Sequence, residues 1–121
     1  MTEKKDDFAA AYMPLVNALL DKHAEEVTVH DLSEVSGFAD IFVVAIARSA
    51  LNARTLKETA ADTLDEMGFL YRVEGENSTR WTLMDAGALI VNLLSREGRD
   101  FYRLDSLWGD APTKKFVDTD D

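Results

Sequence analysis

The spacing of hydrophobic and polar positions along the chain predicts where helices and strands lie. Apolar residues recur every three or four positions up to about Ala24, as in an amphipathic helix, and Pro14 is expected to stand in its first turn. A second helical stripe follows Ser49, a residue suited to capping a helix, and Gly68 is expected to end it. The pattern therefore predicts two main helices with strands between and after them.

Five segments have the pattern or composition of β-strands. The segment 40–47 is a continuous apolar and β-branched run, which is typical of a central strand covered on both faces. The remaining four segments are expected at 26–32, 69–74, 80–85 and 89–94. A loop rich in turn-forming residues separates the segments 69–74 and 80–85, and it predicts a β-hairpin.

After the last predicted strand, the segments with a regular pattern are short and are separated by polar residues. Short helical segments are expected over 96–102 and 104–108, and Pro112 is expected to end the ordered part. We therefore predict one α/β (α+β) domain over residues 1–112, with a mixed sheet of about five strands flanked by helices. Residues 113–121 are predicted to be a flexible acidic tail.

Charge narrows the choice of partners. The chain of 121 residues carries 23 acidic and 13 basic side chains, for a net charge of −10. Such a chain repels the phosphates of nucleic acids, so little direct nucleic-acid binding is expected, whereas a basic protein surface would attract it. The same surplus of acidic side chains could instead serve only to keep the protein soluble. With no cysteine, no apolar run long enough to span a membrane and no secretory leader, we expect a cytoplasmic protein without membrane attachment.

The residues that carry chemistry do not form a recognisable active site. His23 and His30 lack carboxylates at metal-ligand spacing, and there is no nucleophile elbow or phosphate-binding loop. A nucleotidyltransferase needs two carboxylates on one strand after a Gly-Ser turn. Asp40 follows such a turn, but the position two residues later is Phe42. The sequence therefore favours a non-enzymatic protein with no cofactor and no metal, and a divergent nucleotidyltransferase-like enzyme is the alternative.

Large aromatic residues gather in the second half of the chain, namely Trp81, Phe101, Tyr102 and Trp108. Trp81, Leu83 and Asp85 alternate with polar and apolar neighbours and should share one face of a strand. Trp81 could be a core residue, or it could anchor a partner, because tryptophan is enriched at binding hot spots. The anchor hypothesis is preferred, and a general protein-interaction adaptor remains a further option.

Three stretches of the chain resemble the ribosomal silencing factor family, also called Iojap. The first is Ala39-Asp40-Ile41-Phe42-Val43-Val44, followed by Ser49. The second is Glu74-Gly75-Glu76-Asn77-Ser78, then Trp81-Thr82-Leu83-Met84-Asp85 and Gly87. The third is Arg99-Asp100-Phe101-Tyr102-Arg103-Leu104, then Leu107-Trp108-Gly109-Asp110-Ala111-Pro112. The chain departs from the family pattern at Ala88, Asn92 and Leu94, where the family usually has Asp, His and an aromatic residue.

The resemblance implies a mixed sheet similar to a nucleotidyltransferase core that has lost its catalytic carboxylates. It implies that the protein binds the large ribosomal subunit through the basic universal large-subunit ribosomal protein fourteen. Bound there, it would block joining of the small subunit and repress translation, and it would act on free large subunits during late assembly. A homodimer is possible when no ribosome is bound. The residues expected to contact the partner are Trp81, Leu83, Asp85, Asn92, Arg99, Tyr102, Trp108 and Asp40.

Overall fold

The computed structural model of the chain describes residues 8–34, 39–75, 78, 80–102 and 111–117. Its elements follow in the order η1 (Ala10–Tyr12), α2 (Met13–Asp21), β1 (Glu26–Asp31), β2 (Ile41–Ala47), α3 (Ala50–Glu66), β3 (Arg72–Glu74), β4 (Trp81–Ala86), β5 (Leu89–Ser95), α4 (Arg96–Tyr102) and β6 (Thr113–Val117). The predicted order of helices and strands up to α4 is therefore confirmed.

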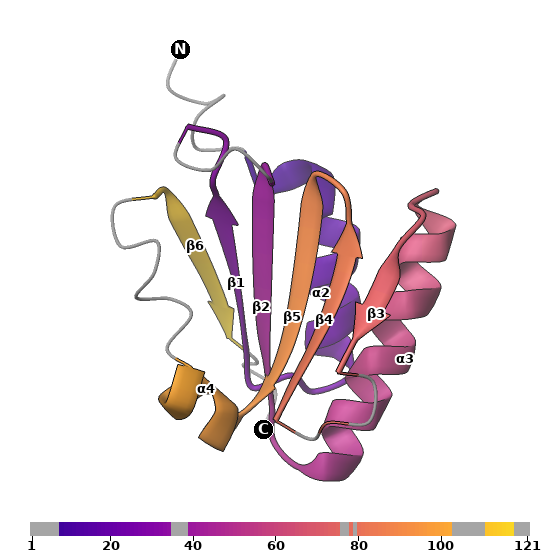
Figure 1. Ribbon diagram of the computed structural model, residues 1–121, viewed down its shortest axis with the longest axis vertical. Coiled ribbons are helices and arrows are strands. Elements are labelled where there is room, and N and C mark those ends of the chain that lie inside the picture. Colours follow the sequence, from indigo (N-terminus) through magenta and orange to yellow (C-terminus); the bar gives the residue numbers. More distant parts are fainter. Residues whose placement is uncertain (1–7, 35–38, 76–77, 79, 103–110, 118–121) are drawn as a thin grey trace.

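The strands form one mixed sheet in the order β3-β4-β5-β2-β1-β6 (Figure 1). The two central strands, β2 and β5, pair in parallel, and the other neighbouring strands pair antiparallel. The predicted fold class, a mixed sheet flanked by helices, is confirmed. The described part of the chain holds six strands, against the five or so that were expected.

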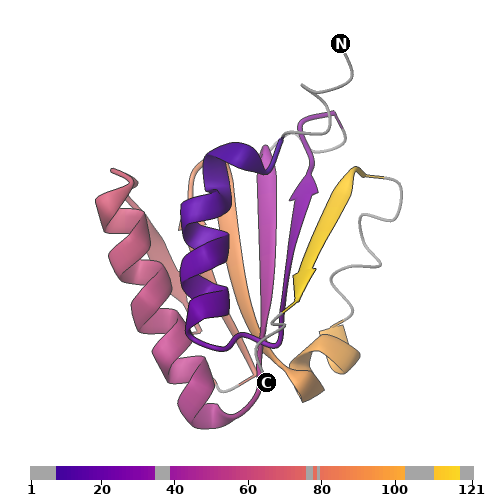
Figure 2. The ribbon, with the colours of Figure 1, turned by 180° about the vertical axis from the view of Figure 1, so that it is seen from behind.

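Helices α2 and α3 lie side by side on one face of the sheet (Figure 2). The predicted cap of α3 is confirmed, because the Ser49 hydroxyl accepts a hydrogen bond from the backbone N–H of Asn52 at 3.0 Å. Gly68 follows the helix with φ of 86°, a conformation that glycine adopts easily. Leu56, Ala60 and Leu64 are fully buried against the sheet.

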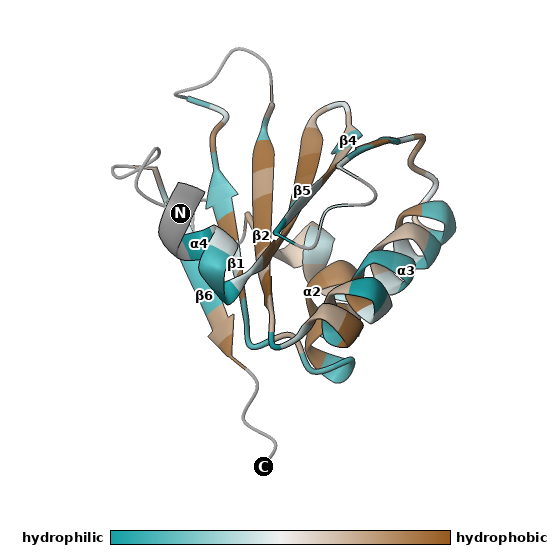
Figure 3. Cartoon of the chain, turned by 60° about the horizontal axis from the view of Figure 1, so that its bottom comes forward, coloured by the Kyte–Doolittle hydropathy of each residue, from teal (hydrophilic) through white to brown (hydrophobic). Residues whose placement is uncertain are grey.

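Strand β2 is buried over its whole length, as its continuous apolar run predicted. Val43 and Ala45 belong to the core beneath the helices. Phe42 and Val44 belong to a second apolar cluster on the other face of the sheet. Figure 3 shows the consequence: β2 and β5 are hydrophobic strands at the centre, whereas α3 is hydrophilic along its outer side.

The prediction that ordered structure ends at Pro112 was wrong. Residues Thr113–Val117 form β6, which pairs antiparallel with β1, and Phe116 packs against the core beneath the helices. An edge strand needs only one apolar face, and lysines are common there because they discourage pairing with other chains. The tail predicted over 113–121 is therefore a strand up to Val117, and residues 118–121 lie outside the described residues.

Strand β3 is shorter than the predicted segment 69–74, because the backbone N–H of Phe69 bonds the Leu64 carbonyl at 2.9 Å and closes the end of α3. The helical turn predicted over 104–108 lies outside the part of the chain that the structure describes.

Candidate partner-binding face

We call the side of the sheet that faces away from α2 and α3 the far face. Its buried members form one apolar cluster, which consists of Leu32, Ala39, Phe42, Val44, Ile46, Ile90, Leu94 and Ala111. Trp81 and Leu83 pack against this cluster and are only partly buried. Apolar side chains thus become accessible toward β4, near one edge of the sheet.

Strand β4 carries three of the predicted contact residues on the far face. Trp81, Leu83 and Asp85 are each partly exposed, whereas the alternate residues of the strand are buried. The prediction that these three share one face is confirmed. Asp85 also accepts a hydrogen bond from the backbone N–H of Gly87 at 3.0 Å, which stabilises the turn between β4 and β5.

The indole of Trp81 is held at its polar edge. Its Nε1–H donates to Oδ1 of Asn92 at 2.8 Å, and Nδ2 of Asn92 donates to the Val43 carbonyl at 3.4 Å. Asn92 lies on β5, fully buried, and Leu83 is its cross-strand partner. The ring of Trp81 therefore packs on the apolar cluster, while part of its surface stays accessible.

A hollow of about 210 Å³ lies beside Trp81. The residues that line it are Glu74, Gly75, Trp81 and Leu83. The hollow therefore extends from β3 to β4 on the far face. Glu74 is exposed, and it is the charged residue among the four that line the hollow. The hollow can accept a side chain with an apolar stem and a positive end, since the ring faces attract cations and the carboxylate pairs with them.

Two glycines fix the backbone where β4 begins. A Cβ on Gly75 would lie 2.5 Å from the Trp81 carbonyl oxygen, and one on Gly98 would lie 2.2 Å from the Arg80 carbonyl oxygen. Gly75 also has φ of 73°. The Arg80 carbonyl accepts a hydrogen bond from Ser95 N–H at 3.1 Å. Close backbone contact on both sides therefore determines where Trp81 starts its strand.

Of the other predicted contact residues, the structure places Asp40 and Arg99, and both lie away from Trp81. Asp40 is exposed and lies just before β2. Its backbone N–H donates a hydrogen bond to the Ala88 carbonyl at 2.8 Å. Asp40 therefore stands at the opposite end of the sheet from Trp81, which pairs with Leu94. Arg99 pairs through Nη1 with Glu26 at 3.1 Å, on β1. Tyr102 ends α4, and its side chain and Trp108 lie outside the described residues. The structure thus groups Trp81, Leu83, Asp85 and Asn92, and it separates Asp40 and Arg99 from them.

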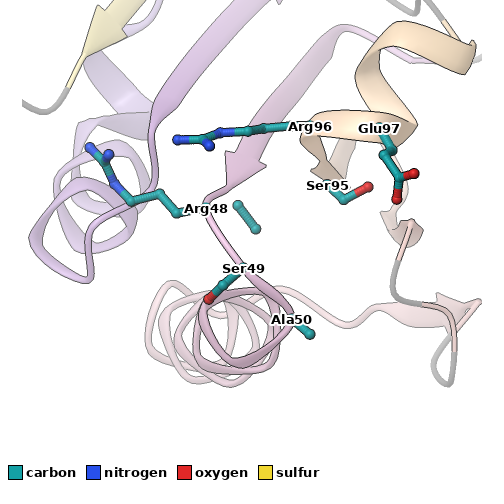
Figure 4. Close-up of a pocket in the computed structure, with 7 residues that line it drawn as sticks. Arg48, Ser49, Ala50, Ser95, Arg96 and Glu97 are labelled. Atoms are coloured by element: carbon teal, nitrogen blue, oxygen red, sulfur yellow. The ribbon is translucent and has the colours of Figure 1, made fainter.

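A second hollow, of about 230 Å³, was not foreseen from the sequence. It lies where the parallel strands β2 and β5 end, and Figure 4 shows the residues that line it, namely Ala47, Arg48, Ser49, Ala50, Ser95, Arg96 and Glu97. Arg48 Nε donates to the His23 carbonyl at 2.9 Å, and Arg96 forms an ion pair with Glu25. Both guanidinium groups therefore hold the connection between α2 and β1.

Within residues 8–34, 39–75, 78, 80–102 and 111–117, no three His, Asp or Glu residues are grouped so that they could hold a metal ion. In the same part of the chain, no helix is both long and apolar enough to cross a membrane.

Comparison with known proteins gives the family. Residues 5–121 match the family described as ribosomal silencing factor during starvation. The ribosomal silencing factor RsfS of Halalkalibacterium halodurans is 34% identical over 81% of this chain and 85% of that protein. That of Bacillus subtilis is 33% identical over 76% of this chain and 79% of its own length. A crystal structure of a protein from Chromobacterium violaceum superposes with a TM-score of 0.77 at 27% identity, covering 83% of this chain and 84% of that one. The chain belongs to the ribosomal silencing factor family.

Proposed function

We propose that the protein docks on the large ribosomal subunit through the basic universal ribosomal protein fourteen and sterically blocks joining of the small subunit. The observation that carries the proposal is the partly exposed indole of Trp81, which stands beside a hollow at the edge of an apolar sheet face. Such a site can bury a partner's side chain without any chemical step. The relatives that the chain matches are named ribosomal silencing factors, which agrees with this proposal.

The charges around Trp81 suit a basic protein better than bare RNA. Glu74 lines the hollow beside the indole, Asp85 lies on the same face opposite Arg72, and the whole chain carries a net charge of −10. A lysine or arginine of the partner could place its stem on the indole and its positive end against Glu74. The same carboxylates repel phosphate groups, so the rRNA is expected to contribute little to the contact.

Blocking requires only that the protein occupies a surface that the small subunit needs. The protein would then repress translation without an enzymatic step, and it would act wherever free large subunits are found, in the cytoplasm. Docking to a ribosomal protein at the subunit interface would also keep a large subunit from joining a small subunit while the large subunit is still in late assembly.

A binding experiment with matched variants tests the proposal. The protein is immobilised, and its affinity for purified ribosomal protein fourteen is measured for the wild type, Trp81→Ala and Leu70→Ala. Leu70 is a suitable control because it is 92% exposed and lies before the Arg72–Asp85 end of the β3–β4 ladder, away from Trp81. We expect Trp81→Ala to weaken binding at least thirtyfold, the scale of a hot-spot residue, and Leu70→Ala to leave it nearly unchanged. Equal losses in the two variants, or none in Trp81→Ala, would contradict the proposed site.

A further inference from the structure

Asn92 is an unusual residue for its position. It lies on the central strand β5, its side chain points to the apolar far face, and it is fully buried. Its neighbours along that side of the strand, Ile90 and Leu94, are members of the apolar cluster. A buried amide without hydrogen bonds is costly, so this side chain needs partners of definite chemistry.

The two partners determine the orientation of the amide. The Val43 carbonyl can only accept a hydrogen bond, and the indole N–H of Trp81 can only donate one. Nδ2 of Asn92 must therefore face Val43, and Oδ1 must face the indole, as the distances of 3.4 Å and 2.8 Å show. A side chain at residue 92 needs both a donor and an acceptor, and leucine has neither.

We propose that Asn92 is a positioning residue, which holds the Trp81 indole in the orientation that docking requires. This inference rests on the proposed function. Trp81 packs on the cluster with one part of its surface and lines the hollow with another, so a rotation about its side-chain bonds would change the shape of the hollow. A hydrogen bond from buried Asn92 restrains that rotation before the partner arrives, and a pre-ordered anchor binds more tightly than a mobile one.

A double-mutant cycle separates positioning from any direct effect of Asn92. Affinity for purified large subunits is measured for the wild type, Asn92→Leu, Trp81→Phe and the double variant, at a temperature where melting curves show all four to be folded. Phenylalanine keeps a ring at residue 81 but has no N–H for Asn92 to hold. We expect Asn92→Leu to weaken docking about tenfold in the wild-type background, close to the loss of one restraining hydrogen bond, and to have almost no effect beside Trp81→Phe. A tenfold loss in both backgrounds would overturn the inference.

A second measurement follows the indole in the free protein. The two indole N–H resonances are assigned by their change in Trp81→Phe, and hydrogen exchange of the Trp81 N–H is compared between the wild type and Asn92→Leu. We expect exchange to become at least about tenfold faster in the variant, because the indole N–H loses its buried acceptor. An unchanged rate would show that Asn92 does not hold the ring. If Trp81→Ala docks as the wild type does, the proposed function fails instead, and this exchange rate still decides whether Asn92 orders the indole.

Discussion

The hydroxyl oxygen of Thr113 lies 2.8 Å from Nδ1 of His30, so the first residue of β6 contacts a ring that is only 2% exposed. The same hydroxyl donates to the Ala111 carbonyl at 3.0 Å. Because a hydroxyl has one proton, Nδ1–H of His30 is the donor toward Thr113. The segment after Pro112 is therefore joined to the interior of the sheet by a side chain as well as by its backbone.

We predict that deleting residues 113–121 destabilises the protein. The deletion removes the strand that pairs with β1 and exposes the core beneath Phe116. Loss of the Phe116 packing alone should lower the free energy of unfolding by about 2 kcal/mol. Urea denaturation of the full and truncated chains measures the change. Deleting only residues 118–121 is the matched control and should leave the midpoint nearly unchanged. Equal midpoints for all three chains would show that β6 adds nothing to stability.

Replacing Trp81 with alanine should reduce both folding stability and docking. The substitution leaves Oδ1 of buried Asn92 without its donor, which we expect to cost about 2 kcal/mol of folding free energy. We expect docking to weaken by a further ~2 kcal/mol or more at temperatures where the variant is folded. Thermal melting and a pull-down with the basic ribosomal protein measure the two effects separately. A variant that melts early and still binds normally would assign Trp81 to the core alone.

Docking should weaken as salt concentration rises. Attraction between this protein, with its net charge of −10, and a basic partner is screened over about 10 Å at 0.1 M salt. We expect Glu74→Gln to reduce this salt dependence, since Glu74 lines the hollow beside Trp81. Glu58→Gln is the control, because Glu58 is exposed on α3 on the other side of the sheet. Affinities measured from 0.05 to about 0.5 M salt test this, and an identical slope for wild type and Glu74→Gln would exclude Glu74 from the contact.

Gly98→Ala should disturb the start of β4. The added Cβ would stand 2.2 Å from the Arg80 carbonyl oxygen, so α4 or β4 must move. We expect a loss of about 1–3 kcal/mol of stability, the usual range for overpacking, and a shift of the neighbouring Trp81 indole resonance. Gly87→Ala is the comparison, because a Cβ there meets nothing within 4 Å and only the φ of 83° is strained. A Trp81 resonance that moves in Gly87→Ala and stays in Gly98→Ala would contradict this account.

Much of the fold could be predicted because its central elements carry strong patterns. The apolar run of β2, the Ser49 cap and the Gly68 stop each have a local physical cause. Strand β6 could not be predicted in the same way. An edge strand with one buried face needs few apolar residues, and in Thr113–Val117 the burial of Phe116 depends on β1, more than 80 residues earlier.

The candidate site could be predicted only in part for a related reason. The sequence of β4 alone was enough to place Trp81, Leu83 and Asp85 on one face, because side chains alternate between the two faces of any strand. The bond between Trp81 and Asn92 depends on the register of two strands. A turn at Gly87 and Ala88 pairs Leu83 with Asn92, and this pairing brings Asn92 diagonally beside Trp81.

The central claim is that the bound protein keeps the ribosomal subunits apart, and subunit joining tests it most directly. Purified large and small subunits are mixed under joining conditions with increasing amounts of the protein and separated on a sucrose gradient. We predict that joined ribosomes decrease as the protein is added and that it sediments with the free large subunit. The account would be contradicted if joined ribosomes formed to the same extent while the large subunits were saturated with the protein.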